Sequence, residues 1–223
     1  MGAGKSALTR RFVDLSHAVG DVPYPGLPEP RVDAHMSFEA SHAHYAPGTE
    51  FEIARVTMVA NTGTYIDAPS HRFRGHGDVS TLPLEKLADL DALVVDARGQ
   101  VSIDASAFAG LALRGKAVLV RTEWSRHFGT PEYGRGHPFL SAGAAHQLVA
   151  AGAALVGIDS LNIDDTADAL RPVHTALLAA GIPIVEHLRG LGELPPRDFR
   201  FFAVPARIRG LGSFPVRAFA IVD

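Results

Sequence analysis

The chain contains no cysteine, which excludes disulfide bonds, thiolate-bound zinc, iron–sulfur clusters and cysteine nucleophiles. It also has no long basic run, and its formal net charge is −3. Nucleic acids and anionic membrane surfaces are therefore not expected as partners. No segment approaches the run of about 18 apolar residues that a membrane-spanning helix needs. Because the chain has no cysteine, any metal ion must be held by histidine, carboxylate, amide or hydroxyl groups.

The N-terminus reads MGAGKSALTRRF and lacks the continuous apolar region of a secretory signal. We therefore expect residues 1–10 to form a flexible leader, residues 11–223 to form one domain, and the protein to be cytoplasmic. The length of 223 residues and the hydrophobic content of 47% fit one large domain with a full core.

Four short runs are almost entirely apolar and rich in β-branched residues: ALVVDA, KAVLV, ALVGID and PIVE. Such runs indicate strands that are buried on both faces. Two helices are expected between them. Ser141 can cap the first helix and Gly152 can end it, whereas Pro172 suits the first turn of the second helix, which Gly181 can end. Shorter strand and turn patterns before and after these units predict a mixed α/β fold.

The densest chemical signal is the segment NTGTYIDAPSHRF, residues 61–73. It places His71 one helical turn after Asp67, with Pro69 between them. If Asp67 begins a helical turn, the two side chains project to the same side. A carboxylate beside an imidazole can act as a metal ligand and a general base. The same spacing also fits a capping aspartate and a surface histidine, so the spacing alone leaves both interpretations open.

This segment resembles the H-x-G-T-H-x-D-x-P-x-H motif of the cyclase family, which is typified by bacterial kynurenine formamidase and isatin hydrolase-like enzymes. The motif is matched at Gly63, Thr64, Asp67, Pro69 and His71. Its first two histidines are replaced by Asn61 and Tyr65. The resemblance continues through GIDSLNIDD, His174 and Glu186, and it runs from VDLSHAVGDVPYPG to PVRAFAI. It implies a single-domain, cyclase-like (swivelling β/β/α) fold with a mixed sheet.

The resemblance also implies a site. Asp67, His174 and Glu186 would be metal ligands, and His71 would be the catalytic acid/base. Imidazole nitrogens suit zinc, whereas amide and phenol oxygens are harder donors. Because Asn61 and Tyr65 replace two imidazoles, we expect one divalent metal ion per chain at most, either zinc or a harder ion such as manganese. An empty site is the alternative.

Three further candidates for substrate contact are Asn61, Trp124 and His187. Trp124 belongs to a segment that resembles the family's substrate-proximal loop, and His187 stands where relatives have asparagine. Tyr65 is a second catalytic candidate, because its phenol could donate to a substrate carbonyl or a developing oxyanion. Alternatively, Tyr65 and Asn61 fill the space of a lost metal ion.

By resemblance, the protein is expected to be a hydrolase of a small-molecule amide or formamide, arylformamidase-like, or of a cyclic amide or lactone. One alternative is a metal-independent cyclase, dehydratase or isomerase that uses Tyr65 and His71 for proton transfer. Another is a non-catalytic ligand-binding relative that lost its metal. The expected partners are a small-molecule substrate and further copies of the chain, in a dimer or tetramer.

Overall fold

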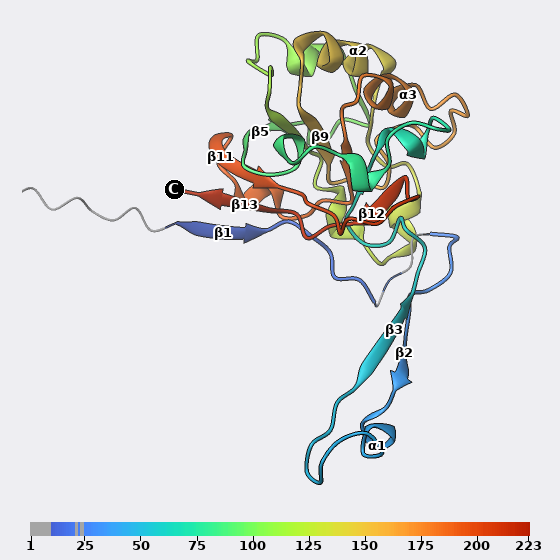
Figure 1. The fold of residues 1–223 in the computed structure, drawn as a ribbon. Helices are drawn as coiled ribbons and strands as arrows, with labels where there is room; N and C mark the ends of the chain where they lie inside the picture. Colours follow the sequence, from blue (N-terminus) through green and yellow to red (C-terminus); the bar gives the residue numbers. More distant parts are fainter. Residues whose placement is uncertain (1–9, 21, 23–24) are drawn as a thin grey trace, which may run out of the picture.

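The computed structural model describes residues 10–20, 22 and 25–223, so nearly all of the predicted leader lies outside the described residues. A nine-stranded mixed sheet forms the centre of the molecule (Figure 1). Its strands, in sheet order, are β1 (Arg11–Asp14), β13 (Phe219–Val222), β11 (Arg197–Phe202), β5 (Leu90–Asp96), β7 (Ala117–Arg121), β9 (Leu155–Ile158), β10 (Ile184–Glu186), β4 (Tyr65–Asp67) and β12 (Ser213–Pro215).

The four predicted apolar runs form the parallel centre of this sheet, β5, β7, β9 and β10. Alternate side chains of these strands enter two different cores. Val118 and Val156 pack on one face with residues of the helices α2 (Ala142–Ala151) and α3 (Pro172–Ala179). Leu119 and Leu155, from the other face, pack with residues of β1, β11 and β13. The prediction of strands buried on both faces, in a mixed α/β fold, is confirmed.

Both predicted helices begin and end as expected. The side chain of Ser141 accepts a hydrogen bond from the backbone N–H of Ala144 at 3.2 Å and caps α2. Gly152 ends α2 in the left-handed conformation, with φ of 73°. Pro172 occupies the first turn of α3, and Gly181, with φ of 66°, follows its end. Local capping signals therefore determined these boundaries.

The remaining elements are short. A two-stranded sheet pairs β6 (Ser102–Ile103) with β8 (Phe139–Leu140). Single-turn 3₁₀ helices lie in the connections: Pro69–His71, Val79–Thr81, Leu84–Lys86, Ala105–Phe108, Trp124–His127, Pro131–Gly134 and Leu191–Glu193. None of the helices in the described part of the chain has the length and apolar character that crossing a membrane requires.

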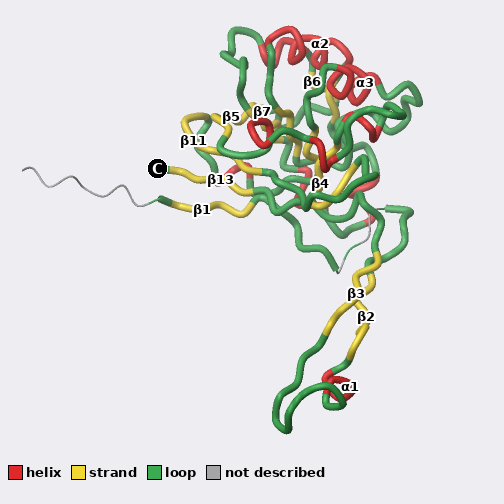
Figure 2. Tube along the Cα trace, in the orientation of Figure 1, coloured by secondary structure: helices red, strands yellow, loops and turns green. Residues whose placement is uncertain are grey.

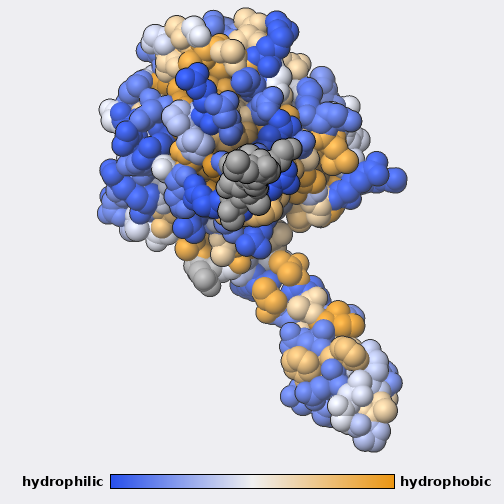
Figure 3. Space-filling model, turned by 90° about the vertical axis from the view of Figure 1, so that its left-hand side faces the viewer, coloured by the Kyte–Doolittle hydropathy of each residue, from blue (hydrophilic) through white to orange (hydrophobic). Residues whose placement is uncertain are grey.

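A hairpin arm projects away from this body (Figures 1 and 2). It consists of β2 (Arg31–Met36), β3 (Ile53–Thr57) and, at its tip, the one-turn helix α1 (Phe38–Ser41). The paired residues Val32 and Val56 are 68% and 57% exposed. Figure 3 shows hydrophobic residues along the arm. An isolated two-stranded hairpin is only marginally stable in water, so this arm lacks the cover that a second layer would give it.

Candidate active site

Strand β4 positions the first part of the site, because it lies between β10 and β12. The register places Tyr65 opposite Glu186 and Asp67 opposite Ser213. Side chains alternate along a strand, so Tyr65 and Asp67 share one face while Ile66 enters the core. The Tyr65 hydroxyl donates a hydrogen bond to Oε2 of Glu186, and the Ser213 hydroxyl donates to Oδ1 of Asp67.

The turn after β4 brings His71 to the same place. Asp67 is the last residue of the strand and the turn begins at Pro69, so the condition that Asp67 begins a helical turn is not met. Even so, Nδ1 of His71 lies 3.9 Å from Oδ1 of Asp67. A Cβ on Gly212 would lie 2.6 Å from Cα of His71. Only glycine therefore lets the start of β12 approach this turn.

A relay of hydrogen bonds fixes the orientation of His71. Nδ1 of His71 is 2.8 Å from the Ser213 hydroxyl oxygen, which itself donates its single proton to Asp67. The Ser213 oxygen must therefore accept from Nδ1–H of His71. In a neutral ring this arrangement, assigned from the hydrogen-bond network, leaves the lone pair on Nε2 of His71, which can then accept a proton or bind a metal ion.

The start of α3 positions His174, and Asp164 holds it there. The Asp164 carboxylate accepts hydrogen bonds from the backbone N–H groups of Val173 and His174, at 2.7 and 3.0 Å. It also lies 2.6 Å from Nδ1 of His174. Nε2 of His174 therefore faces the other carboxylates, 3.5 Å from Oδ2 of Asp67 and 3.8 Å from Oε1 of Glu186. A carboxylate that orients a histidine in this way is typical of metal sites.

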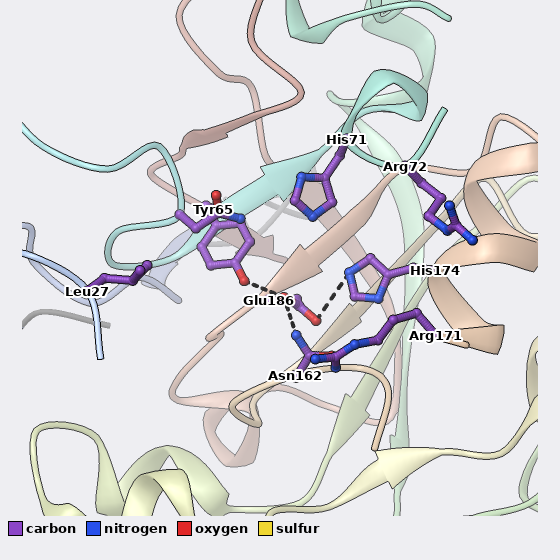
Figure 4. Close-up of a pocket in the computed structure, with 9 residues that line it drawn as sticks. Leu27, Tyr65, His71, Arg72, Asn162, Arg171, His174 and Glu186 are labelled. Atoms are coloured by element: carbon purple, nitrogen blue, oxygen red, sulfur yellow. Dashed lines mark hydrogen bonds and ion pairs between the residues drawn. The ribbon is translucent and has the colours of Figure 1, made fainter. Parts of the chain in front are cut away.

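Glu186 ends β10 and lies at the floor of the site with no exposed surface. Its Oε1 accepts a hydrogen bond from the backbone N–H of Ile163 at 2.6 Å. Its Oε2 accepts from Tyr65 and from the side-chain amide of Asn162, the latter at 3.4 Å. Figure 4 shows Tyr65, Asn162 and His174 converging on this carboxylate. Glu186 is consequently held in one orientation from three sides.

Burial and charge shift the protonation of these groups. Burial disfavours the protonated ring of His174, but Asp164, Asp67 and Glu186 outweigh it and raise the pKa of His174 to about 10. Burial also disfavours the charged form of Asp67, yet the interactions with His174 and His71 lower the pKa of that carboxyl. Burial raises the pKa of Glu186 to about 7, against the charge of His174. The site therefore carries concentrated charge inside the protein.

The residues fit a divalent metal ion. Asp67, His71 and His174 each offer a ligand atom, and these atoms lie within 4.8 Å of one another. Oδ2 of Asp67 is buried and accepts no hydrogen bond from the residues that the structure describes. Nitrogen and carboxylate donors suit zinc or manganese. Two of the three predicted ligands, Asp67 and His174, belong to this group, together with His71. The third predicted ligand, Glu186, lies outside the group, with its Oε1 3.8 Å from Nε2 of His174.

A cavity of about 270 Å³ opens above these groups. Its walls are formed by Leu27, Asn61, Tyr65, His71, Arg72, Asn162, Arg171, His174 and Glu186. The structure thus brings together five of the predicted site residues around one cavity, with Asp67 buried beside His71 and His174. The sequence analysis missed Ser213, Asp164, Asn162, Arg72 and Arg171. Arg72 lies in the segment of residues 61–73, and the string GIDSLNIDD contains Asn162 and Asp164, so these two motifs could have signalled three of the five.

Two predicted substrate contacts lie outside the cavity walls. Trp124 begins a 3₁₀ turn, and its indole N–H donates to the carbonyl oxygen of Tyr133 at 3.0 Å. His187 is 1% exposed, and its Nε2 lies 2.8 Å from the carbonyl oxygen of Leu161. In a single chain both residues therefore support the structure around the site. Direct contact of either residue with substrate stays a prediction.

We expect acid to destabilise the protein through His187. Burial lowers the pKa of this ring to about 4, whereas an unfolded histidine has a pKa of about 6.5. Between these values the unfolded chain binds a proton that the folded chain excludes. The contribution of His187 to the free energy of unfolding is therefore greatest above pH 6.5. As the pH falls toward 4, this contribution decreases by up to about 1.4 kcal/mol per pH unit.

His187→Asn should flatten this pH dependence between pH 7 and pH 5, as measured by urea unfolding. Asparagine tolerates the left-handed backbone at this position, where φ is 58°. The matched control is His146→Asn, which changes an exposed histidine of α2 and should leave the slope unaltered. An equal slope in the His187→Asn variant and the unchanged chain would contradict the assignment.

Comparison with known proteins agrees with this geometry. The model of the Cyclase family matches residues 13–165. The chain is 29% identical to kynurenine formamidase of Bacillus cereus over 220 residues, which cover 94% of this chain and 97% of that protein. It is 30% identical to kynurenine formamidase of Bacillus cytotoxicus over 217 residues, covering 93% and 95%.

Solved structures share the fold over nearly the whole chain. A potential metal-dependent hydrolase with cyclase activity superposes with a TM-score of 0.79 at 25% identity, covering 95% of this chain and 98% of that one. An isatin hydrolase bound to the product analogue thioisatinate gives a TM-score of 0.81 at 19% identity, covering 96% and 92%. At 19% identity, the similarity to this isatin hydrolase shows a shared fold only.

The fold and the site define a mixed α/β protein with a carboxylate–histidine centre at the edge of its parallel strands. The chain belongs to the cyclase family.

Proposed function

We propose that the protein is a metal-dependent hydrolase that cleaves the C–N bond of a non-peptide amide, with the formamide of an aromatic amine as the first candidate substrate. The observation that carries this proposal is the convergence of Asp67, His71 and His174 within 4.8 Å at the floor of a cavity. The kynurenine formamidases, similar over almost the full chain, favour hydrolysis over the cyclase, isomerase and non-catalytic alternatives.

Asp67 and His174 would hold the ion, zinc or manganese, with Glu186 adjoining. A bound divalent ion would polarise the substrate carbonyl and lower the pKa of a water molecule. His71 is the general base and acid in this proposal. Its unprotonated Nε2 takes a proton from the attacking water and returns it to the leaving nitrogen. The products are a carboxylic acid, formate for a formamide, and the free amine.

Tyr65 and Asn61 stand where the family motif has histidines. Because the Tyr65 hydroxyl already donates to Glu186, we assign it a positioning role through that carboxylate. Asn61 lines the cavity and can offer its amide to the substrate. With these two nitrogen donors replaced by an amide and a phenol, one transition-metal ion per chain is the expected maximum.

The test combines metal analysis with turnover. Protein purified without chelator should contain no more than one equivalent of zinc or manganese per chain, measured by plasma mass spectrometry. It should release formate from formanilide-type substrates, and chelation followed by gel filtration should abolish that release until zinc or manganese is restored. Full turnover by metal-free protein would favour a metal-independent enzyme, and two tightly held zinc ions per chain would contradict the expected stoichiometry.

The hairpin arm supports assembly into a dimer or tetramer. Its exposed apolar side chains include Val32, Phe51 and Val56, and a second copy of the chain could cover them. A cytoplasmic location, expected from the sequence, stays a prediction.

A further inference from the structure

Strand β1 forms an outer edge of the nine-stranded sheet (Figure 1). The backbone N–H of Leu15 donates to the carbonyl oxygen of Ala218 at 2.9 Å, which continues the pairing of β1 with β13. In an antiparallel pair, alternate residues exchange these hydrogen bonds. The N–H and C=O groups of Phe12 and Asp14 therefore point to the outer side of the sheet, where a further strand could bind them.

The open stretch lacks three features that commonly protect a sheet edge, namely proline, lysine and a bulge. β12, at the other end of the sheet, contains Pro215. By contrast, β1 reads RFVD and pairs with β13 without a shift of register. Beyond Asp14 the edge is covered, because Ser16 forms a bridge with Leu188. The stretch from Arg10 to Asp14, centred on Phe12, is thus the part that can accept another strand.

Phenylalanine rings line one face of the sheet beside this edge. The Phe12 side chain is 67% exposed, and its ring centroid lies 6.2 Å from that of Phe219. Phe219 in turn stacks on Phe202, with centroids 4.7 Å apart and an interplanar angle of 2°. The alternate residues Val13 and Ala220 belong to the core on the opposite face. The rings therefore form a row across β11, β13 and β1 that ends at an exposed aromatic side chain.

Charges of opposite sign lie on either side of the Phe12 ring. Side chains alternate along a strand, so Arg10 and Asp14 share the face of Phe12. Each makes an exposed ion pair within the chain, Arg10 with Asp223 at 3.4 Å and Asp14 with Arg217 at 2.9 Å. Exposed pairs contribute about 1 kcal/mol or less. Both charges can therefore exchange these partners for others at little cost.

The edge is complementary to itself. When two copies of β1 pair antiparallel about a two-fold axis perpendicular to the sheet, Phe12 lies opposite Phe12 of the second copy. Arg10 then lies opposite Asp14, and this pair occurs twice. The outward-facing backbone groups of Phe12 make it a hydrogen-bonded pair in this register. Opposite charges and aromatic residues across such pairs are stabilising, and two-fold contacts of this kind are the commonest basis of dimers.

We propose that a second copy of the chain adds its β1 to this edge in antiparallel register, which joins two nine-stranded sheets into one. The row of rings then runs from one copy through both Phe12 side chains into the other. Figure 1 shows that the hairpin arm leaves the body at a different place, so this interface is separate from the arm. The two surfaces used together would give a tetramer. The proposal does not depend on the hydrolase function, because β1 lies outside the cavity wall.

The absence of cysteine from the chain allows a direct test of the register. Phe12→Cys should form a disulfide-linked dimer on mild oxidation, seen by non-reducing electrophoresis. The Cα atoms of a hydrogen-bonded antiparallel pair are about 5.5 Å apart, which a disulfide can span. Arg11→Cys should link at least about tenfold more slowly, because two copies of that residue are offset along the strands by about 7 Å.

The matched control is Val101→Cys, at an exposed residue elsewhere in the chain, which measures linkage by random collision. Linkage of Phe12→Cys no faster than this control would overturn the proposal. Faster linkage of Arg11→Cys than of Phe12→Cys would overturn the register.

Charge reversal tests the complementarity without a thiol. Arg10→Glu and Asp14→Lys each place like charges opposite one another across the axis, and each should raise the dissociation constant about tenfold in sedimentation velocity. The double variant should restore the original value. It restores only the contact between copies, because the pairs with Asp223 and Arg217 stay reversed. A double variant that associates as weakly as the sum of both single losses would overturn the pairing of Arg10 with Asp14.

A variant of the arm separates the two surfaces. Val56→Ser changes an exposed residue of β3 that lies away from this edge. Combined with Phe12→Cys, it should leave the rate of disulfide linkage unchanged. Loss of the linkage in the combined variant would overturn the edge interface in favour of contact through the arm.

Discussion

We expect His71→Ala to lower kcat/KM on a formamide substrate by about 10²–10⁴-fold, the usual contribution of a general acid/base. His71 lines the cavity, and because its Nδ1 donates to Ser213, the neutral ring presents Nε2 as the proton acceptor. The side chain is 36% exposed, so its loss should change the free energy of unfolding little. Steady-state kinetics and thermal melts of the same preparations measure both effects.

Metal content decides how that loss is interpreted, because His71 also belongs to the group of three potential ligands. A general base can be removed with the bound metal retained, whereas removal of a ligand lowers metal affinity together with turnover. His76→Ala, at an exposed histidine nearby, is the matched control and should change neither quantity. Near-normal turnover of His71→Ala would remove this residue from the mechanism, and loss of metal would make it a ligand.

The second large effect is expected from Asn61→His combined with Tyr65→His. Residue 65 lies on the same face of β4 as Asp67 and directly opposite Glu186, and Asn61 lines the same cavity. The two new imidazoles would therefore add nitrogen ligands, which zinc prefers, to the donors already present. Zinc affinity should rise by more than about tenfold, equivalent to about 1.4 kcal/mol, in competition titrations with a chromophoric chelator.

The matched control for this experiment is Tyr65→Phe. It removes the hydroxyl that donates to Glu186 and adds no ligand, so zinc affinity should not rise. Leaving this buried carboxylate with one donor fewer should cost about 1–3 kcal/mol of stability. If turnover of the double variant falls while its zinc content rises, Tyr65 takes part in catalysis. No gain in zinc affinity would show that residues 61 and 65 do not face the metal site.

The helices and central strands were predictable because their signals are local. Ser141 and Gly152 mark the ends of α2 by their own hydrogen-bonding and backbone preferences. The apolar run of β9 could only be a buried segment. The sequence left the start of the turn near Asp67 open, because pairing of β4 with β10 and β12 extends the strand to that residue. Such pairing depends on chain segments more than 100 residues away.

By itself, the sequence determined the fold class and the family resemblance, and that resemblance supplied the candidates Asp67, His71, His174 and Glu186. Only the tertiary structure decided which side chains form hydrogen bonds with these candidate residues. Ser213 reaches Asp67 and His71 across 146 and 142 positions. Arg171 faces the cavity through a left-handed backbone that no local signal predicts. The physical reason is that strand register and helix placement are set by burial of the two cores, which is a property of the whole chain.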